Sequence, residues 1–380
     1  MATQAELLQA VEQLRPVVEA NWMQMETERT LPDELVAALD ASGLLMMSAP
    51  RVVGGSELDL IEQLDVYQAV GYLDASLCWA MMTCGTGISW SAGYLSEAAR
   101  NEIYGGSHIP RTAIAVLPAG RATPIDGGYR LTGSWNFCSG VRHAEWLVGG
   151  GILEGPNPRR LFAMFPAEKA TIVDNWHAAG LRGSGSAGFK TENIFVPNRF
   201  VWFFDDPLTL PTKLHRLGLL GFVINEHPGL SLGVARRALD TVKNEAKEAH
   251  SRFRGKSLAG RPVFQKALAE AEIRWLAARS LIENGLRRLW AVVDGDETAV
   301  PSNALLAELR AIGTFISKEA IDITTIAFQY GGGRAIMENN VLQRCLRDIH
   351  AVSQHYLTSD VAFENYGQFI LELHNAYLRG

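Results

Sequence analysis

The spacing of apolar residues changes twice along the chain, and this limits the fold more than any other feature. Up to about residue 110, apolar side chains recur every three or four residues, which is typical of amphipathic helices. From Arg111 to about Pro197, short β-branched and aromatic runs alternate with turn residues, as in strands of a compact antiparallel sheet. Long helical patterns then return. We predict helices near 4–20, 31–44, 57–72, 74–94, 96–104, 225–250, 264–294, 305–327 and 340–374.

This order predicts a mainly α protein with a middle β-domain. We expect an N-terminal helical domain over 1–110, a small β-barrel or sandwich over 111–215, and a C-terminal four-helix bundle over 216–380. The chain has no GxGxxG after a strand and no GxxxxGK[ST]. A nucleotide cofactor would therefore be held by neither a Rossmann motif nor a P-loop.

Composition narrows the class of protein further. The 41 acidic and 35 basic residues are spread without a Lys/Arg block, which argues against nucleic acid as a partner. The four cysteines form no CxxC pair and no zinc-ligand spacing, so we expect reduced thiols and no metal. The polar N-terminus and the lack of a long apolar run indicate a cytoplasmic protein with no membrane partner.

Three segments carry a resemblance to a known family. They are GGYRLTGSWNFCSG at 127–140, LRGSGS at 181–186, and YGGG at 330–333 followed by QRCLRD at 343–348. Together they resemble the acyl-CoA dehydrogenase superfamily, and more closely its reduced-flavin-dependent, two-component monooxygenase branch, which includes aromatic hydroxylases. The resemblance implies a homotetramer, reduced FMN or FAD as cofactor, and a separate flavin reductase as partner.

The resemblance also suggests flavin contacts in the middle domain. Trp135, Phe137 and Ser139 would share one face of a strand, because strand side chains alternate with period two. The resemblance places the two rings against the isoalloxazine and the Ser139 hydroxyl near flavin N5. The alternative is a β-core with a serine in a turn.

Further flavin contacts would come from the bundle. Arg252, Phe264 and Gln265 resemble the stretch with which one subunit holds the flavin phosphates of its neighbour, although a solvated arginine is the alternative for Arg252. Gly331 and Gly332 belong to the glycine-rich turn of the family.

His355 falls where the resemblance places a histidine facing flavin and substrate. With an ordinary pKa of about 6.5, it could take a proton from a phenol and make the aromatic ring more nucleophilic. A capping or surface histidine is the alternative. On one continuous helix, His350 would point elsewhere, since five residues turn the helix by about 140°.

The sequence leaves the reaction open between two enzyme classes. In the dehydrogenases a glutamate follows the RD pair, but Gln354–Thr358 contains no carboxylate, which favours a monooxygenase that hydroxylates a small aromatic or heteroaromatic substrate. Some dehydrogenases carry the base at the start of the first bundle helix, where Glu226 lies, so an acyl-CoA dehydrogenase or oxidase is the alternative. A third possibility is a catalytically silent protein that kept the flavin fold.

Overall fold

The computed structural model describes residues 1–248 and 257–378, and these form two compact units. The first unit comprises residues 1–59, 79–177 and 182–216, and the second comprises 60–78, 178–181 and 217–380. Among the described residues, no helix is both long and apolar enough to cross a membrane.

Helices and one sheet build the first unit. Its helices are α1 (Gln4–Glu28), α2 (Asp33–Ser42), most of α4 (Ala75–Tyr94), α5 (Glu97–Tyr104) and the short α6 (Lys213–Arg216). The capping box between Thr3 and Glu6 starts α1, since each side chain accepts a hydrogen bond from the backbone N–H of the other. The predicted helix at 4–20 is therefore present, and it continues to Glu28.

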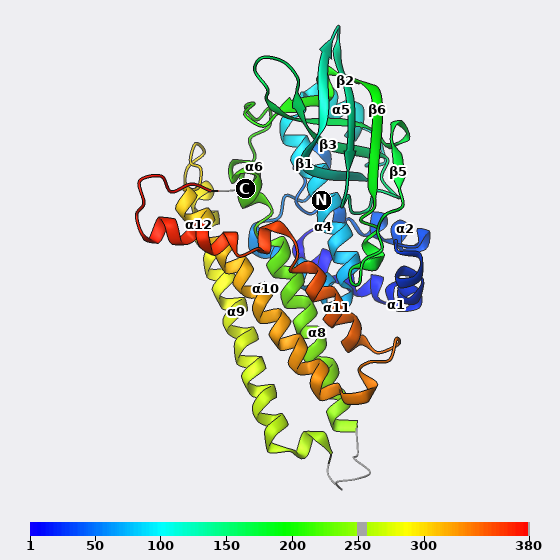
Figure 1. Cartoon of the computed structure of the whole chain (residues 1–380), viewed down its shortest axis with the longest axis vertical. Helices are drawn as coiled ribbons and strands as arrows, with labels where there is room; N and C mark the ends of the chain where they lie inside the picture. The colour runs from blue at the N-terminus through cyan, green and yellow to red at the C-terminus, as the bar shows by residue number, and fades with distance from the viewer. Residues whose placement is uncertain (249–256, 379–380) are drawn as a thin grey trace. The chain divides into compact units, whose positions relative to one another are not determined.

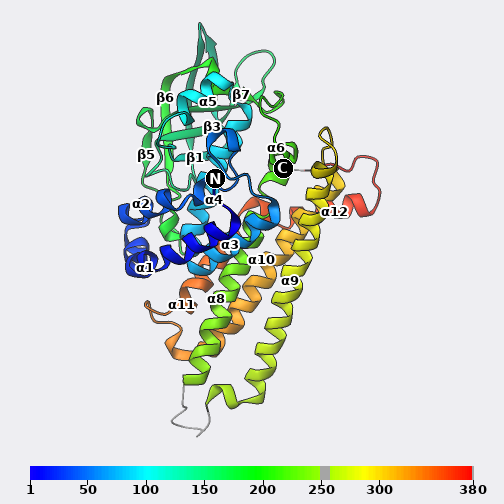
Figure 2. The same ribbon diagram turned by 180° about the vertical axis from the view of Figure 1, so that it is seen from behind.

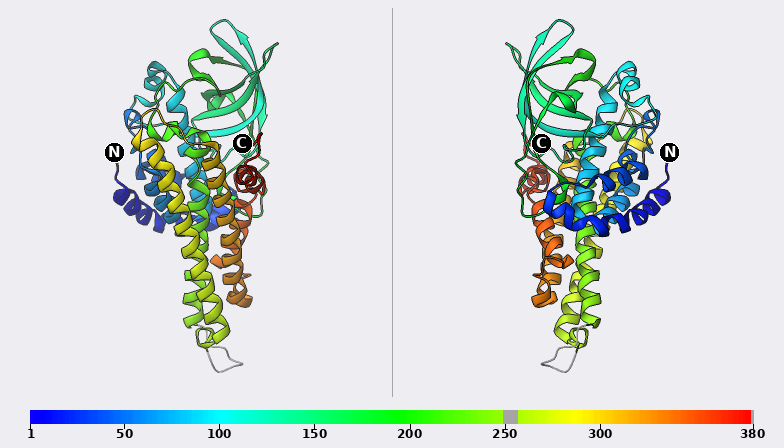
Figure 3. Two further views of the ribbon diagram at one scale, coloured as in Figure 1. Left: turned by 90° about the vertical axis from the view of Figure 1, so that its left-hand side faces the viewer. Right: turned by 90° about the vertical axis from the view of Figure 1, so that its right-hand side faces the viewer.

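The seven strands of the described residues form one mixed sheet in the first unit. They are β1 (Thr112–Ile125), β2 (Gly128–Trp135), β3 (Trp146–Leu153), β4 (Arg160–Pro166), β5 (Thr171–Val173), β6 (Gly188–Pro197) and β7 (Val201–Phe203). Their order is β5-β6-β2-β1-β3-β4-β7, and Figure 3 shows the twist of the sheet from two sides. The pair β1–β3 is parallel, whereas the other pairs are antiparallel as predicted.

The indole of Trp135 fills the centre of this sheet. A Cβ on Gly120, Gly133 or Gly149 would lie 2.6, 2.4 or 2.8 Å from an atom of the ring, so these glycines make room for it. The indole stacks on Phe189 at 4.7 Å between centroids, and its Nε1 donates to the Gly150 carbonyl at 2.8 Å. Trp135 is thus a core residue that fixes the strands relative to one another.

The described regular elements of the second unit are helices. It contains α3 (Leu60–Leu73), α7 (Gly218–Phe222), α8 (Glu226–Glu248), α9 (Pro262–Gly295), α10 (Asn303–Gly331), α11 (Val341–Val352) and α12 (Val361–Ile370). The three long helices α8, α9 and α10 pack side by side (Figure 1), and α3 packs on α8 (Figure 2). That last contact is close, because a Cβ on Gly71 would lie 2.8 Å from the Leu230 carbonyl oxygen.

The predicted single helix over 340–374 is wrong. It is interrupted between α11 and α12 by a 3₁₀ turn over Tyr356–Thr358, for which His355 is the N-cap. Arg310 on α10 donates to the Tyr356 carbonyl at 2.9 Å, which holds that carbonyl away from a helical ladder. The order of helices, β-domain and helices is confirmed, while the boundaries at residues 110 and 215 remain predictions.

Candidate active site

The turn after β2 places two of the predicted flavin contacts in the first unit. The strand ends at Trp135, and Phe137 has a left-handed backbone with φ of 60°. The predicted alternation of Trp135, Phe137 and Ser139 on one strand face is therefore wrong. Phe137 is 72% exposed, whereas Trp135 is 1% exposed and has almost no surface to offer a cofactor.

Ser139 lies at one end of a chain of three buried hydroxyls. Its Oγ accepts a hydrogen bond from Trp79 Nε1 at 2.9 Å and lies 2.7 Å from Ser186 Oγ, which lies 2.7 Å from Ser184 Oγ. The indole N–H of Trp79 can only donate, so Ser139 Oγ accepts that bond. The Ser139 hydroxyl proton then points either to Ser186 or away from it, depending on which serine donates. If Ser184 donates to Ser186 and Ser186 to Ser139, the Ser139 O–H is left to donate elsewhere.

Backbone contacts hold the two serine segments together. Cys138 N–H donates to the Ala187 carbonyl and Gly140 N–H to the Ser184 carbonyl, both at 3.0 Å. Gly140 has φ of 72°, and a Cβ there would lie 2.6 Å from Cys84 Sγ. Only glycine suits position 140, which explains the glycine at the end of the 127–140 motif.

A flat aromatic ligand would find a surface beside this turn. The exposed ring of Phe137 meets Trp176 edge to face at 6.3 Å, and Trp176 Nε1 donates to the Arg182 carbonyl at 3.1 Å. The ring of Phe137 is therefore exposed to a planar ligand, with Trp176 at its edge. The buried Trp135 is not, and its predicted role as a ring wall is not supported.

His355 is half-buried in the second unit beside a second histidine. Its ring stacks on that of His227 at 4.5 Å between centroids and lies 4.8 Å from the Tyr356 ring. Burial, with a smaller effect of the Arg310 charge, lowers the pKa of His355 to about 4. The expectation of an ordinary pKa is therefore wrong, and the imidazole is neutral at pH 7. Its Nδ1 accepts from Leu357 N–H at 3.4 Å, so it also caps the turn.

His227 on α8 adjoins this histidine, and Glu226 precedes His227 on the same helix. Burial and the neighbouring His355 lower the pKa of His227 well below its usual value. Glu226 is 5% exposed and accepts a long hydrogen bond of 3.5 Å from the Tyr67 hydroxyl. Burial, together with the Glu226 charge, raises the pKa of Tyr67. Glu226 is thus a buried carboxylate on the same helix turn as His227.

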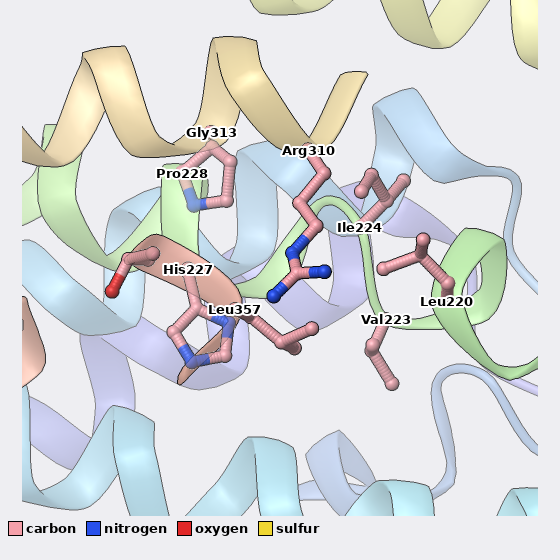
Figure 4. A pocket seen from close by; sticks show the side chains of 9 residues that line it. Leu220, Val223, Ile224, His227, Pro228, Arg310, Gly313 and Leu357 are labelled. Carbon is pink, nitrogen blue, oxygen red and sulfur yellow. The ribbon is translucent and has the colours of Figure 1, made fainter. Parts of the chain in front are cut away.

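A pocket opens among α7, α8, α10 and the 3₁₀ turn. The pocket is small and partly open, and Figure 4 shows the Arg310 guanidinium reaching among its side chains. The lining residues are Leu220, Val223, Ile224, His227, Pro228, Arg310, Gly313, Leu357 and Thr358. The sequence analysis missed His227 and Arg310. His227 directly follows Glu226 and could have been found there, but nothing in the helical pattern marks Arg310 as buried.

The other predicted cofactor residues gather far along the bundle. Phe264 packs on Tyr330 at 5.1 Å, which brings the start of α9 to the end of α10, where Gly331 and Gly332 lie. Gln265 is exposed there, and its side chain donates to the Ala259 carbonyl. At about 1.5 Å per residue, this end of α10 lies roughly 30 Å from Arg310. Arg252 lies outside the described residues.

Comparisons with known proteins agree with this architecture. The family model described as acyl-CoA dehydrogenase, N-terminal domain, matches residues 2–104, and the model described as acyl-CoA dehydrogenase, C-terminal domain, matches residues 227–360. Both matches fall on the helical parts of the chain.

Curated relatives cover nearly the whole chain. A pigment production hydroxylase of Rhodococcus sp. is 28% identical over 98% of this chain and 97% of its own length. An indole-3-acetate monooxygenase of Pseudomonas putida is 27% identical over 90% of this chain and 88% of its own. The oxygenase subunit HsaA, a flavin-dependent monooxygenase of Rhodococcus jostii, is 28% identical over 92% of this chain and 93% of its own length.

Solved structures share the fold. The HsaA monooxygenase of M. tuberculosis superposes with a TM-score of 0.89 at 24% identity, covering 99% of this chain and 100% of its own. XiaF from Streptomyces sp., solved with FADH2 and glycerol, superposes with a TM-score of 0.88 at 24% identity. The match covers 99% of this chain and 97% of XiaF. The chain belongs to the acyl-CoA dehydrogenase-like superfamily and, by homology, to its flavin-dependent monooxygenases.

Proposed function

We propose that this protein is the oxygenase component of a two-component flavin monooxygenase that hydroxylates a small aromatic or heteroaromatic compound. The observation that carries the proposal is the placement of His355, which stacks on His227 and lies after the RD pair, where the dehydrogenases place a carboxylate. In the net reaction, reduced flavin supplies two electrons, one atom of O₂ enters the substrate and the other leaves as water.

We assign a separate role in this reaction to each of three side chains. His355 would take the proton of a substrate hydroxyl. Its lowered pKa keeps the imidazole unprotonated at pH 7 but also makes it a weaker base than free histidine. Phe137 would offer its exposed ring to the flavin, and Ser139, although only 2% exposed, would donate its O–H toward the flavin when Ser186 donates to Ser139. Apolar side chains around the pocket exclude water from the reacting groups.

The cofactor is reduced FMN or FAD. The relatives do not decide between the two, since XiaF was solved with FADH2 and KijD3 with FMN. The rough 30 Å along α10 between the pocket and Gly331–Gly332 is too long for one flavin to touch both. Phe264, Gln265, Gly331 and Gly332 would therefore serve the flavin of a neighbouring copy, as in a homotetramer.

The names of the relatives support the proposed substrate class and electron source. Their names specify indole-3-acetate and p-hydroxyphenylacetate as compounds acted upon, and both are aromatic acids. Because two relatives are named as an oxygenase subunit or component, a separate reductase supplies the reduced flavin. A cytoplasmic location, expected from the sequence, stays a prediction.

Replacing His355 tests the proposed base. His355→Gln should lower the rate of product formation from reduced flavin, O₂ and an aromatic phenol by about 10²- to 10⁴-fold, the usual contribution of a general base. His350→Gln is the matched control, since His350 is exposed at the end of α11 and should keep the wild-type rate. Equal rates for wild type and His355→Gln would remove the base assignment.

The alternative enzyme class depends on Glu226. Its burial beside Tyr67 at the start of α8 suits a carboxylate that removes an α-proton from an acyl-CoA. In that case an acyl-CoA would bleach the bound oxidised flavin under anaerobic conditions, and Glu226→Gln would abolish the bleaching. We expect no bleaching with the wild-type protein.

A further inference from the structure

Two side chains of α10 contact the segment that follows α11. Arg310 Nη2 donates to the Tyr356 carbonyl at 2.9 Å, and Lys318 Nζ donates to Asp360 Oδ1 at 2.6 Å. The two positions on α10 are about two helical turns apart, so both side chains reach the same side of the helix. These bonds attach the 3₁₀ turn and the start of α12 to α10 within the second unit.

Burial decides which of these contacts holds the turn more firmly. Arg310 is 3% exposed, whereas the side chains of Lys318 and Asp360 are 55% and 75% exposed. An exposed ion pair contributes little, because water competes for both charges. A buried hydrogen bond from a charged donor contributes more. Thr314, between the two on α10, reaches the Ser359 carbonyl only at 3.5 Å. Arg310 is therefore the main tie between the turn and α10.

The turn also satisfies part of its backbone by itself. Ser359 Oγ donates to the Tyr356 carbonyl at 2.8 Å, and the Ser359 N–H donates to it at 3.4 Å. These bonds close the turn but do not connect it to another helix. Arg310 makes that connection: its side chain extends from α10 toward Leu357 (Figure 4), and its guanidinium lies 5.6 Å from the centroid of the Tyr356 ring.

The position of His355 follows from the position of this turn. His355 is the N-cap of the turn, and its Nδ1 accepts from Leu357 N–H at 3.4 Å. Its carbonyl accepts from Thr358 N–H at 2.9 Å, and its ring stacks on His227 of α8 at 4.5 Å between centroids. Because the carbonyl that Arg310 holds belongs to the next residue, a shift of the turn would move the imidazole relative to His227.

We propose that Arg310 is a positioning residue for His355. By holding the Tyr356 carbonyl against α10, Arg310 keeps the imidazole stacked on His227, in the place from which it would take the proton of a substrate hydroxyl. The inference rests on the proposed function for the role of His355 as a base. A displacement of a catalytic group by about 1 Å can lower a rate by about 10²-fold, so the loss of this contact has a measurable consequence.

Replacing Arg310 would also change the charge near the imidazole. The titratable groups in this region are His227 and Glu226 on α8, Arg310 on α10, the adjacent Tyr356, and Tyr67 on α3 through Glu226. Burial is the main cause of the low pKa of His355, and the Arg310 cation is the second. Both effects weaken when the cation is removed and the turn moves. The pKa of His355 should then rise from about 4 toward its ordinary value.

NMR spectroscopy of the full-length protein, without flavin or substrate, tests the placement. The ring signals of His355 are identified by their loss in His355→Gln. In Arg310→Met, which keeps a long side chain but has no N–H donor, these signals should shift and the pKa of His355 should rise. Arg310→Lys keeps a cation that can donate to the carbonyl, so both changes should be smaller. Lys318→Met breaks only exposed contacts and should leave the signals at their wild-type positions.

Turnover separates positioning from a merely structural role. With an aromatic phenol, reduced flavin and O₂, Arg310→Met should lower the rate at saturating substrate by about 10- to 100-fold. The Kd for the phenol, measured by equilibrium dialysis without turnover, should stay within a few-fold of wild type. Arg310→Lys should recover part of the lost rate. A loss of stability alone would lower the rate only through the folded fraction, which urea unfolding measures.

Unchanged ring signals and an unchanged pKa of His355 in Arg310→Met would overturn the inference, as would a wild-type rate. If Arg310→Met does not fold, Arg310→Lys decides, because an ammonium does not reproduce the planar fork of a guanidinium and should still shift the signals. Wild-type signals in that variant would refute the positioning role. If the wild-type protein hydroxylates no phenol, the proposed function fails, while the NMR result still decides whether Arg310 places His355.

Discussion

At the scale of single residues, burial lowers the pKa of three histidines of the described chain. Burial lowers the pKa of His215 and of His355 to about 4 each, and it lowers that of His227 well below its usual value. His215 is fixed between Thr212 and the Ser89 carbonyl, at 2.7 and 2.9 Å, so it has a structural role in the first unit. All three imidazoles are neutral in the folded protein at pH 7.

This burial predicts a loss of stability in mild acid. Unfolded histidine takes up a proton near pH 6.5, but folded His215 and His355 do so only near pH 4. Between these values the unfolded state binds more protons, so stability falls as the pH drops. Urea unfolding at pH 5 and 7.5 should differ by about 2 kcal/mol for each of these two histidines. His350→Gln should leave the difference unchanged, and equal stability at both pH values would refute the explanation.

Sequence motifs identified only part of the candidate site. Phe137 and Ser139 were found because their motif is local, and the structure places them on one turn. The orientation of Trp135 was missed because glycines from separate strands create its space. Arg310 was missed because its burial depends on packing against the turn at Tyr356.

At the scale of elements, the RD pair of α11 anchors the start of the LRGSGS segment. Asp348 is 2% exposed, and its carboxylate accepts from Leu181 N–H at 2.7 Å. Arg347 donates to the Ala179 carbonyl at 2.7 Å. Leu181 has a left-handed backbone with φ of 52°, which this pair of contacts helps to hold. The RD pair is therefore explained as a structural clamp within the second unit.

Breaking the clamp should cost stability. Asp348→Ala leaves the Leu181 N–H buried without its acceptor, which should lower the free energy of unfolding by about 1–3 kcal/mol. Asp360→Ala is the matched control, because Asp360 pairs with Lys318 at the surface and should matter by less than about 0.5 kcal/mol. Equal urea midpoints for the two variants would contradict the clamp.

The sequence predicted the long helices well, but it did not predict where one helix is interrupted or which strands pair in parallel. Periodicity located each long helix, since an amphipathic face repeats over many residues. It failed at the break after Val352, where hydrogen bonds from a distant helix and a histidine cap override the local pattern. The parallel β1–β3 pair was likewise invisible, because pairing depends on contacts between strands.

At the scale of the whole molecule, the order of its parts was readable from the sequence. Helices, a middle sheet and a helical bundle follow one another as expected, because each type of periodicity extends over a hundred residues or so. The groups with candidate chemistry occupy both compact units, with Phe137 and Ser139 in the first and His355, Glu226 and Arg310 in the second.

The most direct test of the account follows the oxygen atom. The purified protein would be mixed anaerobically with chemically reduced FMN or FAD and an aromatic acid, then supplied with isotopically labelled O₂, and the product analysed by mass spectrometry. We predict a hydroxylated product that carries one labelled oxygen atom, formed in proportion to the reduced flavin consumed. Complete conversion of the reduced flavin to oxidised flavin and hydrogen peroxide, with no labelled product from any aromatic acid or phenol, would contradict the assignment as a monooxygenase.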